Sequence, residues 1–324
     1  MEIPTNRSII KLQGDASTRE YFRLNFDDPA HLPKTMILMK LPAPFIEAEN
    51  DFLILREYLH DCGVPVPEIF GKRPAEGEIY LDDCGDLLLE GALTSASADE
   101  ITRHYMNVID ILVKMQVHCT SSLAIGNPAT TRKFDTAKYM YELEHAKKWF
   151  IIGHLKKNLS PEEDRKLTDW FLKLVTPLEE EPLVFSHRDY HSRNIMIKDG
   201  NYFILDFQDA MMGPAQYDLV SLLFDSYVRL DDGIRNRLAA YYIEKLNSEE
   251  GNPVKGVNIA KNLIRISLQR NIKALGTFGF QAESRKNPFF LKYVPNTFDY
   301  VKSNIVKIDE FAESAEWILS LLAP

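Results

Sequence analysis

The sequence predicts an α+β protein with a small β-rich N-terminal lobe and a larger, mainly helical C-terminal lobe. Three observations support this prediction. Short apolar, strand-like segments alternate with turns over the first part of the chain, and apolar residues recur at helical spacing beyond it. Two further strand-like segments, Ile195–Ile197 and Tyr202–Leu205, interrupt the helical part. We therefore divide the chain into residues 1–85 and residues 86–324.

Composition places the chain among ordinary globular proteins. It has 324 residues, of which 45% are hydrophobic and 26% are charged, and its formal net charge is −9. This acidic balance argues against a nucleic-acid-binding protein, and no apolar run approaches the roughly 18 residues of a membrane-spanning helix. The three cysteines lack metal-site spacing, which favours reduced thiols and a cytoplasmic location. The sequence thus predicts no nucleic-acid or membrane partner, and it leaves the oligomeric state open.

The N-terminal lobe is predicted to open with a hairpin made of the strands Ile9–Leu12 and Tyr21–Leu24. Backbone N–H groups in its turn are suited to cradle the phosphates of a nucleotide. A plain β-turn accounts for the same residues equally well. The candidate phosphate-binding residues of the turn are Gly14, Asp15, Ala16 and Ser17.

The next strand, Thr35–Leu41, carries Lys40 near its end, and a helix is predicted over residues 45–60. A lysine at the end of a buried strand, beside a phosphate-binding turn, is suited to contact the α- and β-phosphates of a nucleotide. Glu49 on the helix is the candidate partner of this lysine, with Glu47 as the alternative. The same charged residues are also typical of solvent-exposed positions.

The strand Glu78–Leu81 runs into the polar linker that joins the two lobes. Leu81 closes the strand, and Asp83 lies in the linker. Backbone groups at such a strand-to-linker crossing can hydrogen-bond an adenine ring. We therefore count Leu81 and Asp83 among the candidate nucleotide-binding residues.

Capping motifs predict where two helices of the C-terminal lobe begin. Ser97 with Glu100, and Ser160 with Glu163, form capping boxes ahead of apolar stripes. A further helix is predicted over residues 136–151, where apolar residues share one face.

The segment 185–208 contains oxygen-bearing side chains at a spacing typical of phosphotransferases. Asp189 ends a His-Arg-Asp triplet, Asn194 follows after four residues, and Asp206 lies twelve positions further on. The two strands between Asn194 and Asp206 are joined by the turn Asp199–Asn201. A hairpin would therefore bring both side chains together at its open end.

These residue types suit phosphoryl transfer. Asp189 is a carboxylate able to accept or orient a hydroxyl proton, while Asn194 and Asp206 are hard oxygen donors suited to Mg²⁺. The pattern predicts an ATP-dependent kinase. The alternative is structural, because Asp and Asn are also typical of turns and strand ends. Asp218, at the start of an apolar helix, is expected to accept backbone N–H bonds from the catalytic loop.

Taken together, these blocks resemble the aminoglycoside-phosphotransferase-like branch of the protein-kinase-like fold. Within this branch the sequence is most similar to the anomeric kinases that act on N-acetylmuramate and N-acetylglucosamine in cell-wall recycling. The segments with this resemblance are Gly14–Arg19, Tyr21–Arg23, His187–Asn194, Asp206–Ala210, Gly213–Pro214, Tyr217–Leu223 and Leu268–Gly276.

The resemblance implies ATP and Mg²⁺ as cofactors, and transfer of the γ-phosphoryl group to an amino-sugar hydroxyl, the C1 hydroxyl above all. It implies that Asp189 is the base and that Asn194 and Asp206 are the metal ligands. At Lys40 the sequence departs from these relatives, which often carry Asp in that place. The phosphate contact is therefore expected either from Lys40, with Glu49 as its partner, or from elsewhere in the chain.

A lactyl carboxylate on the acceptor, if muramate is the substrate, would need a cation. Arg193, Arg270 and Lys273 are the candidates, and each also fits a structural or surface role. Because Arg193 lies within the catalytic loop, we place it with Asp189 among the candidate catalytic residues.

Rival functions share parts of this pattern. An aminoglycoside kinase would need an acidic pocket, and a choline- or homoserine-type kinase would share the same catalytic loop. A catalytically silent nucleotide-binding regulator fits less well, because Asp189, Asn194 and Asp206 are all present. A protein kinase is disfavoured, since Gln208 stands where glycine is expected and no Ala-Pro-Glu follows.

Overall fold

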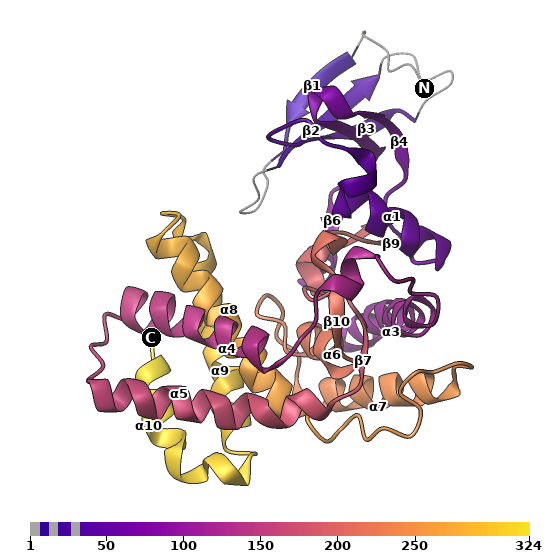
Figure 1. Cartoon of the computed structure of the whole chain (residues 1–324). Helices are drawn as coiled ribbons and strands as arrows, with labels where there is room; N and C mark the ends of the chain where they lie inside the picture. Colours follow the sequence, from indigo (N-terminus) through magenta and orange to yellow (C-terminus); the bar gives the residue numbers. More distant parts are fainter. Residues whose placement is uncertain (1–6, 13–18, 27–32) are drawn as a thin grey trace.

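The computed structural model describes residues 7–12, 19–26 and 33–324, and it separates a β-rich N-terminal part from a larger helical part (Figure 1). The N-terminal part contains a five-stranded antiparallel sheet with the strand order β1-β2-β3-β5-β4. Its strands are β1 (Arg7–Lys11), β2 (Glu20–Phe26), β3 (Thr35–Lys40), β4 (Ile69–Arg73) and β5 (Glu78–Asp82). The predicted α+β class with a small β-rich N-terminal lobe is confirmed.

Residues of this sheet alternate between two faces. Leu24, Met36 and Leu38 pack together in a small cluster on one side, which we call the outer face. Met39 and Leu81 belong to the main core, which includes the helix after β3 and continues into the C-terminal lobe. We call this second side, which faces the C-terminal lobe, the inner face.

Helix α1 (Asp51–Asp61) packs against the inner face. The sequence predicted a helix over residues 45–60, and the observed helix begins later. A short 3₁₀ turn, η1 (Glu47–Glu49), comes first, and Asn50 then caps α1 by accepting a hydrogen bond from the backbone N–H of Leu53. Asparagine is among the strongest N-cap residues, so the cap sets the start of the helix.

The C-terminal lobe is built mainly from helices, and the predicted capping boxes begin α3 and α5. Helix α4 begins at Thr136, as predicted, and continues as the π-helical segment η5 (Lys147–His154), three residues beyond the predicted end. The helices are α2 (Leu89–Leu93), α3 (Ala98–Lys114), α4 (Thr136–Ala146), α5 (Pro161–Val175), α6 (Gln216–Leu223), α7 (Asp232–Ser248), α8 (Leu263–Glu283), α9 (Val294–Ile305) and α10 (Ala315–Leu322). Among the described residues, none of these helices is long and apolar enough to cross a membrane.

Two small sheets belong to the C-terminal lobe. One joins β6 (Leu87–Leu88), β8 (Ile195–Lys198) and β9 (Asn201–Ile204), and the other joins β7 (Leu183–Ser186) and β10 (Met211–Pro214). The predicted hairpin is confirmed, because β8 pairs with β9 in antiparallel register. Its turn residues Asp199 and Gly200 both have positive φ angles, of 51° and 78°, as the tightest hairpin turns require.

Helix α8 runs through the C-terminal lobe and contacts α4, η5, α6 and α9 (Figure 1). Two glycines allow its close approach to the continuous helix formed by α4 and η5. A Cβ atom on Gly276 would lie 2.5 Å from the Cα of Ala146, and one on Gly279 would lie 2.5 Å from the carbonyl oxygen of Trp149. The helix backbones thus touch directly, and this contact fixes where the side chains of α8 enter the site described below.

We predict that Gly276→Ala lowers the free energy of unfolding by about 1–3 kcal/mol, because the new methyl group meets backbone that has no room to move. The matched control is Gly91→Ala on α2, where the nearest atom, Leu87 Cδ1, would be at an ordinary 3.6 Å. The control should keep or slightly raise stability, since alanine favours helix over glycine. Chemical denaturation of both variants measures the difference, and equal stability would contradict the packing argument.

Candidate active site

The loop between β7 and β8 is held by a buried carboxylate on α6. Asp218 accepts hydrogen bonds from the backbone N–H groups of His187 and Arg188, at 2.7 and 2.9 Å. Its side chain is fully buried. The predicted supporting role of Asp218 is confirmed. These bonds satisfy a carboxylate that would otherwise be costly to bury, and they fix the start of the loop.

The loop backbone is strained where it is held. Arg188 has a φ angle of 78°, in the left-handed region that non-glycine residues rarely adopt. Such a conformation costs on the order of 1–3 kcal/mol and persists only where the surroundings impose it. The two bonds to Asp218 provide that constraint, and they set the direction in which the next residue, Asp189, leaves the loop.

A second buried carboxylate holds the other end of the loop. Asp225, just beyond α6, accepts hydrogen bonds from the backbone N–H groups of Ser192 and Tyr227, each at 2.9 Å. Burial raises the pKa of Asp225, although these hydrogen bonds oppose the shift. Sequence reasoning missed this residue, because an aspartate after an apolar helix is common, and only the folded loop shows what it binds.

The predicted metal-ligand pair lies together at the open end of the β8–β9 hairpin. The backbone N–H of Leu205 donates to the carbonyl of Asn194 at 2.9 Å, which places Asp206 beside Asn194 across the hairpin. The Asn194 amide nitrogen donates to the carbonyl of Asp189 at 2.9 Å, leaving its oxygen for a cation. Asp206 has a φ angle of 62° and accepts a hydrogen bond from Gln208 at 2.8 Å.

This pair fits a cation that takes few ligands from protein. Among the described residues, no group of three or more His, Cys, Asp or Glu side chains could hold a metal ion. Mg²⁺ needs no such group, because it commonly binds one or two protein oxygens together with water and phosphate oxygens. The donors of Asn194 and Asp206 therefore suit Mg²⁺ bound with a phosphate ester, and they do not suit a dedicated protein cage.

Asp189 lies beside a lysine from a distant part of the chain. The Nζ of Lys273, on α8, is 3.0 Å from Oδ1 of Asp189, whose side chain is 27% exposed. Burial raises the pKa of Asp189, but the positive charges of Lys273 and Arg188 outweigh it and hold that pKa well below its usual range. Asp189 is therefore ionised near neutral pH and is a weak base.

A cavity of about 320 Å³ joins these groups. It is rich in cationic side chains, and it places Asp189, the metal-ligand pair and all three candidate carboxylate-binding residues around one space. Its polar lining consists of Arg188, Asp189, His191, Arg193, Asn194, Asp206, Asp225, Ser226, Tyr227, Arg270, Lys273, Thr277 and Gln281. Ala274, Phe278 and Phe290 add an apolar wall.

Arg193 lines the same cavity within an aromatic enclosure. Its guanidinium carbon lies 5.1 to 5.6 Å from the ring centres of Tyr227, Phe289 and Phe290, and its Nη1 donates to the hydroxyl of Tyr293 at 3.2 Å. The predicted catalytic role of Arg193 stays a prediction. Its packing makes it a fixed positive wall of the cavity.

The structure does not pair Lys40 with Glu49, and the nucleotide-binding roles of the two residues stay predictions. Lys40 stands opposite Glu20 and Glu78 on the neighbouring strands, and its Nζ lies 3.9 Å from Oε1 of Glu78. Because strand residues alternate, Lys40 shares the outer face with Leu38 and points away from the cleft. The alternative, Glu47, pairs instead with Lys72.

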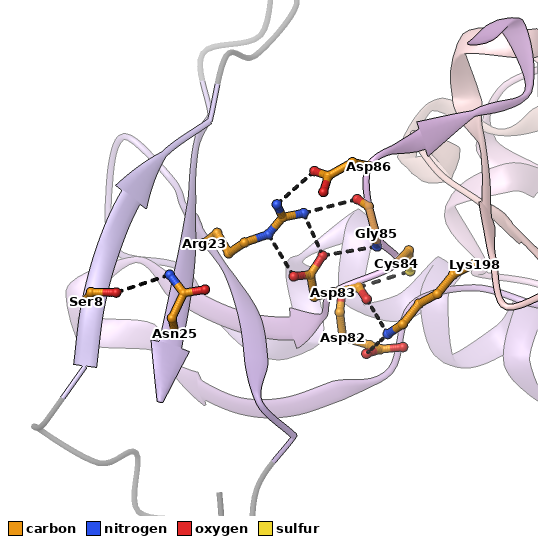
Figure 2. Close-up of polar contacts among 9 residues, drawn as sticks. All are labelled: Ser8, Arg23, Asn25, Asp82, Asp83, Cys84, Gly85, Asp86 and Lys198. Carbon is orange, nitrogen blue, oxygen red and sulfur yellow. Dashed lines mark hydrogen bonds and ion pairs between the residues drawn. The ribbon is translucent and has the colours of Figure 1, made fainter. Parts of the chain in front are cut away.

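At the linker, Asp83 is bound by the chain itself. Its carboxylate forms a two-point ion pair with Arg23 of β2, at 2.7 and 3.0 Å, and accepts from the backbone N–H of Gly85 (Figure 2). The Asp83 carbonyl accepts from Lys198. The nucleotide-binding roles of Asp83 and of the buried Leu81 stay predictions, and the side chain and carbonyl of Asp83 already have partners.

The predicted phosphate-binding residues Gly14, Asp15, Ala16 and Ser17 lie outside the described residues.

Comparisons with known proteins find relatives that match nearly the whole chain. The N-acetylmuramate/N-acetylglucosamine kinase of Pseudomonas aeruginosa is 28% identical over 321 residues, covering 99% of this chain and 90% of the relative. The protein of the same name from Pseudomonas putida is also 28% identical, over 327 residues, with the same two coverages.

Solved structures share the fold at low sequence identity. A choline kinase from Cryptosporidium parvum superimposes with a TM-score of 0.60 at 15% identity, covering 99% of this chain and 94% of that one. An ADP-bound aminoglycoside phosphotransferase gives 0.59 at 12% identity, with coverages of 92% and 93%. The model of the phosphotransferase enzyme family matches residues 8–252. The chain therefore belongs to the phosphotransferase enzyme family.

Proposed function

We propose that this kinase uses ATP and Mg²⁺ to phosphorylate an amino-sugar hydroxyl, the C1 hydroxyl of N-acetylmuramate, N-acetylglucosamine or both. The names of relatives that cover nearly the whole chain support this acceptor. The observation on which the proposal rests is the charge of the cavity around Asp189. Four cationic side chains and three carboxylates line it.

This charge distribution disfavours the cationic acceptors of other family members. A polycationic aminoglycoside would meet Arg270 and Lys273 in a cavity that it needs to be acidic. A quaternary ammonium such as choline needs an open aromatic cage, and here the rings of Tyr227, Phe289 and Phe290 already surround Arg193. A neutral sugar, or a sugar bearing a carboxylate, suits the cavity better.

The weak basicity of Asp189 also fits an anomeric acceptor. The C1 hydroxyl of a reducing sugar is more acidic than an ordinary alcohol, because the ring oxygen stabilises its anion. A carboxylate with a lowered pKa can orient such a hydroxyl and accept its proton late in the transfer. Lys273, 3.0 Å from Asp189, holds that carboxylate in place and favours negative charge on the attacking oxygen.

Asn194 and Asp206 would hold Mg²⁺, which supplies charge neutralisation for the phosphate groups when it is bound. The strained loop and the hairpin contribute alignment, since phosphoryl transfer depends on positioning more than on covalent chemistry. We assign nucleotide binding to residues 1–85 and acceptor binding to residues 86–324. We place the reaction in the cytoplasm, where ATP is available.

The proposal is tested by measuring ADP release with Mg·ATP across a panel of N-acetylmuramate, N-acetylglucosamine, kanamycin, choline and homoserine. We expect turnover on the N-acetylated sugars, with NMR locating the new phosphate on C1. The Asp206→Ala variant is the blank. Turnover on kanamycin or choline alone would overturn the acceptor, and ADP release with none of the five would overturn the proposal as stated.

Two substitutions separate the base from the metal site. Asp189→Asn should lower kcat by about 10²- to 10⁴-fold while leaving the dissociation constant of the nucleotide nearly unchanged. Asp206→Ala should abolish turnover and also weaken the Mg²⁺-dependent part of nucleotide binding. Steady-state kinetics with calorimetric titration measures both quantities. An unchanged kcat in Asp189→Asn would show that the base is elsewhere.

The ion pair between Lys273 and Asp189 predicts a pH effect. Asp189 must be ionised to accept the proton, and the lysine stabilises the ionised form. Lys273→Met should therefore raise the pKa of Asp189, and the acid limb of the pH profile of kcat should move to higher pH. Lys302→Met is the matched control, because Lys302 pairs with Asp299 on α9 and does not line the cavity. A shift of the same size in both variants would contradict the assignment.

A further inference from the structure

Strand β3 presents no cation to the cleft. Its inner-face residues are Ile37 and Met39, both apolar, while Lys40 lies on the outer face between Glu20 and Glu78. In protein kinases a lysine on this strand, paired with a glutamate on the next helix, holds the nucleotide phosphates. Here Lys40 lies beside Glu78 and is not paired with Glu49, which leaves room for a cation from another element at the phosphates.

Strand β2 carries polar side chains along its inner face. Tyr21 stands opposite Met39, and Arg23 stands opposite Ile37 and reaches the linker. Arg19 comes two residues before Tyr21, directly ahead of the strand. Arg19, Tyr21 and Arg23 thus occupy alternate positions, which in a strand share one face. Arg23 is the one at the linker, and Arg19 is the farthest from it.

The guanidinium of Arg19 is connected to the residue after Asp206 through two aromatic rings. Its central carbon is 5.8 Å from the ring centre of Phe52, on α1. Phe52 in turn stacks on Phe207, with ring centres 5.0 Å apart and planes at 21°. Because Phe207 directly follows Asp206, this stack connects Arg19 to the loop that carries the metal-ligand pair.

Tyr21 links the same two sites. Burial raises its pKa, and Arg19 opposes that shift both by its charge and by a side-chain hydrogen bond. The charge of Asp206 also acts on Tyr21 and raises its pKa further. Tyr21 is thus within electrostatic range of both Arg19 and Asp206, in agreement with the stacking contacts.

We propose that Arg19 is the residue that binds the nucleotide phosphates in this kinase, in place of the lysine of β3. The proposal rests on the use of a nucleoside triphosphate put forward above. In this arrangement Phe52 of α1 positions the cation, as the glutamate of the corresponding helix does in protein kinases. Tyr21 orients the guanidinium of Arg19 by a hydrogen bond.

Arginine is chemically suited to this position. Its planar guanidinium can donate two parallel hydrogen bonds to phosphate oxygens, where a lysine offers a point charge. An aromatic ring positions a guanidinium without cancelling its charge, whereas a glutamate cancels part of it. Arg19 would therefore offer a fixed, strongly positive fork beside the metal-binding carboxylate.

The test is equilibrium binding of ATP, ADP, AMP and adenosine to the full-length protein, without acceptor and with Mg²⁺, by calorimetry and competition. Arg19→Ala should lower the affinities for ATP and ADP by about 10- to 100-fold, which is the loss expected for charge-assisted hydrogen bonds. The affinity for adenosine should fall by less than about twofold. Arg19→Lys should recover part of the lost ATP affinity, because it restores the charge without the fork.

Two lysine variants complete the design. Lys40→Ala tests the rival position directly, and Lys72→Ala on β4 removes an exposed, ion-paired lysine of the same sheet as a control. Both should keep the ATP and adenosine affinities of the unaltered protein. Thermal unfolding without ligand establishes that each variant is folded before titration.

The outcomes are distinct. A loss of ATP affinity in Lys40→Ala that Arg19→Ala does not show would overturn the proposal. Equal weakening of ATP and adenosine in Arg19→Ala would also overturn it, since that pattern indicates a structural role. If the unaltered protein bound ATP normally but failed on every acceptor, the proposed acceptor would fail while Arg19 stood. If it bound no nucleotide, both proposals would fall.

Discussion

The site depends on the burial of one carboxylate. Asp218 is inside the protein, where an unpaired charge would cost several kcal/mol, and two backbone N–H groups of the catalytic loop satisfy it. The loop in turn can hold the positive φ angle of Arg188 only while those bonds exist. From the same loop, His187 donates through Nε2 to the carbonyl of Leu205 at 2.8 Å, which ties the position of Asp189 to that of the metal hairpin. One buried charge therefore aligns both halves of the site.

Features that depend on residues close together in the sequence were predicted well. The hairpin of β8 and β9 was predictable because Asp199 and Gly200 tolerate the positive φ angles of a tight turn. The starts of α3 and α5 were predictable because a capping box is complete within four residues. The role of Asp218 followed from a simple cost argument, since a carboxylate that opens an apolar helix must find donors nearby. Each of these inferences needed only neighbouring residues or one physical rule.

Features that depend on distant parts of the chain were not predictable. The face of β3 on which Lys40 lies was hidden because the four residues before it, Met36 to Met39, are all apolar, so alternation leaves no mark in the sequence. Lys273 reaches Asp189 only because the glycines of α8 let that helix approach its neighbour closely. The Arg19–Phe52–Phe207 stack joins three elements, and none of the three residues shows it alone.

Strand β2 carries two arginines, one on it and one just before it, that contact different parts of the structure. Arg23, on this strand, grips the linker through Asp83 and Asp86, the latter at 2.8 Å, and its Nη2 also donates to the carbonyl of Gly85 at 3.1 Å (Figure 2). Arg19 lies four residues earlier, a distance of about 13 Å along an extended chain, and contacts the ring of Phe52, which stacks on Phe207. Arg23 therefore contacts the linker, while Arg19, just ahead of the strand, contacts the helix whose Phe52 stacks on Phe207. Strand β2 and the residue before it thus connect the linker to the helix that packs on the residue following Asp206.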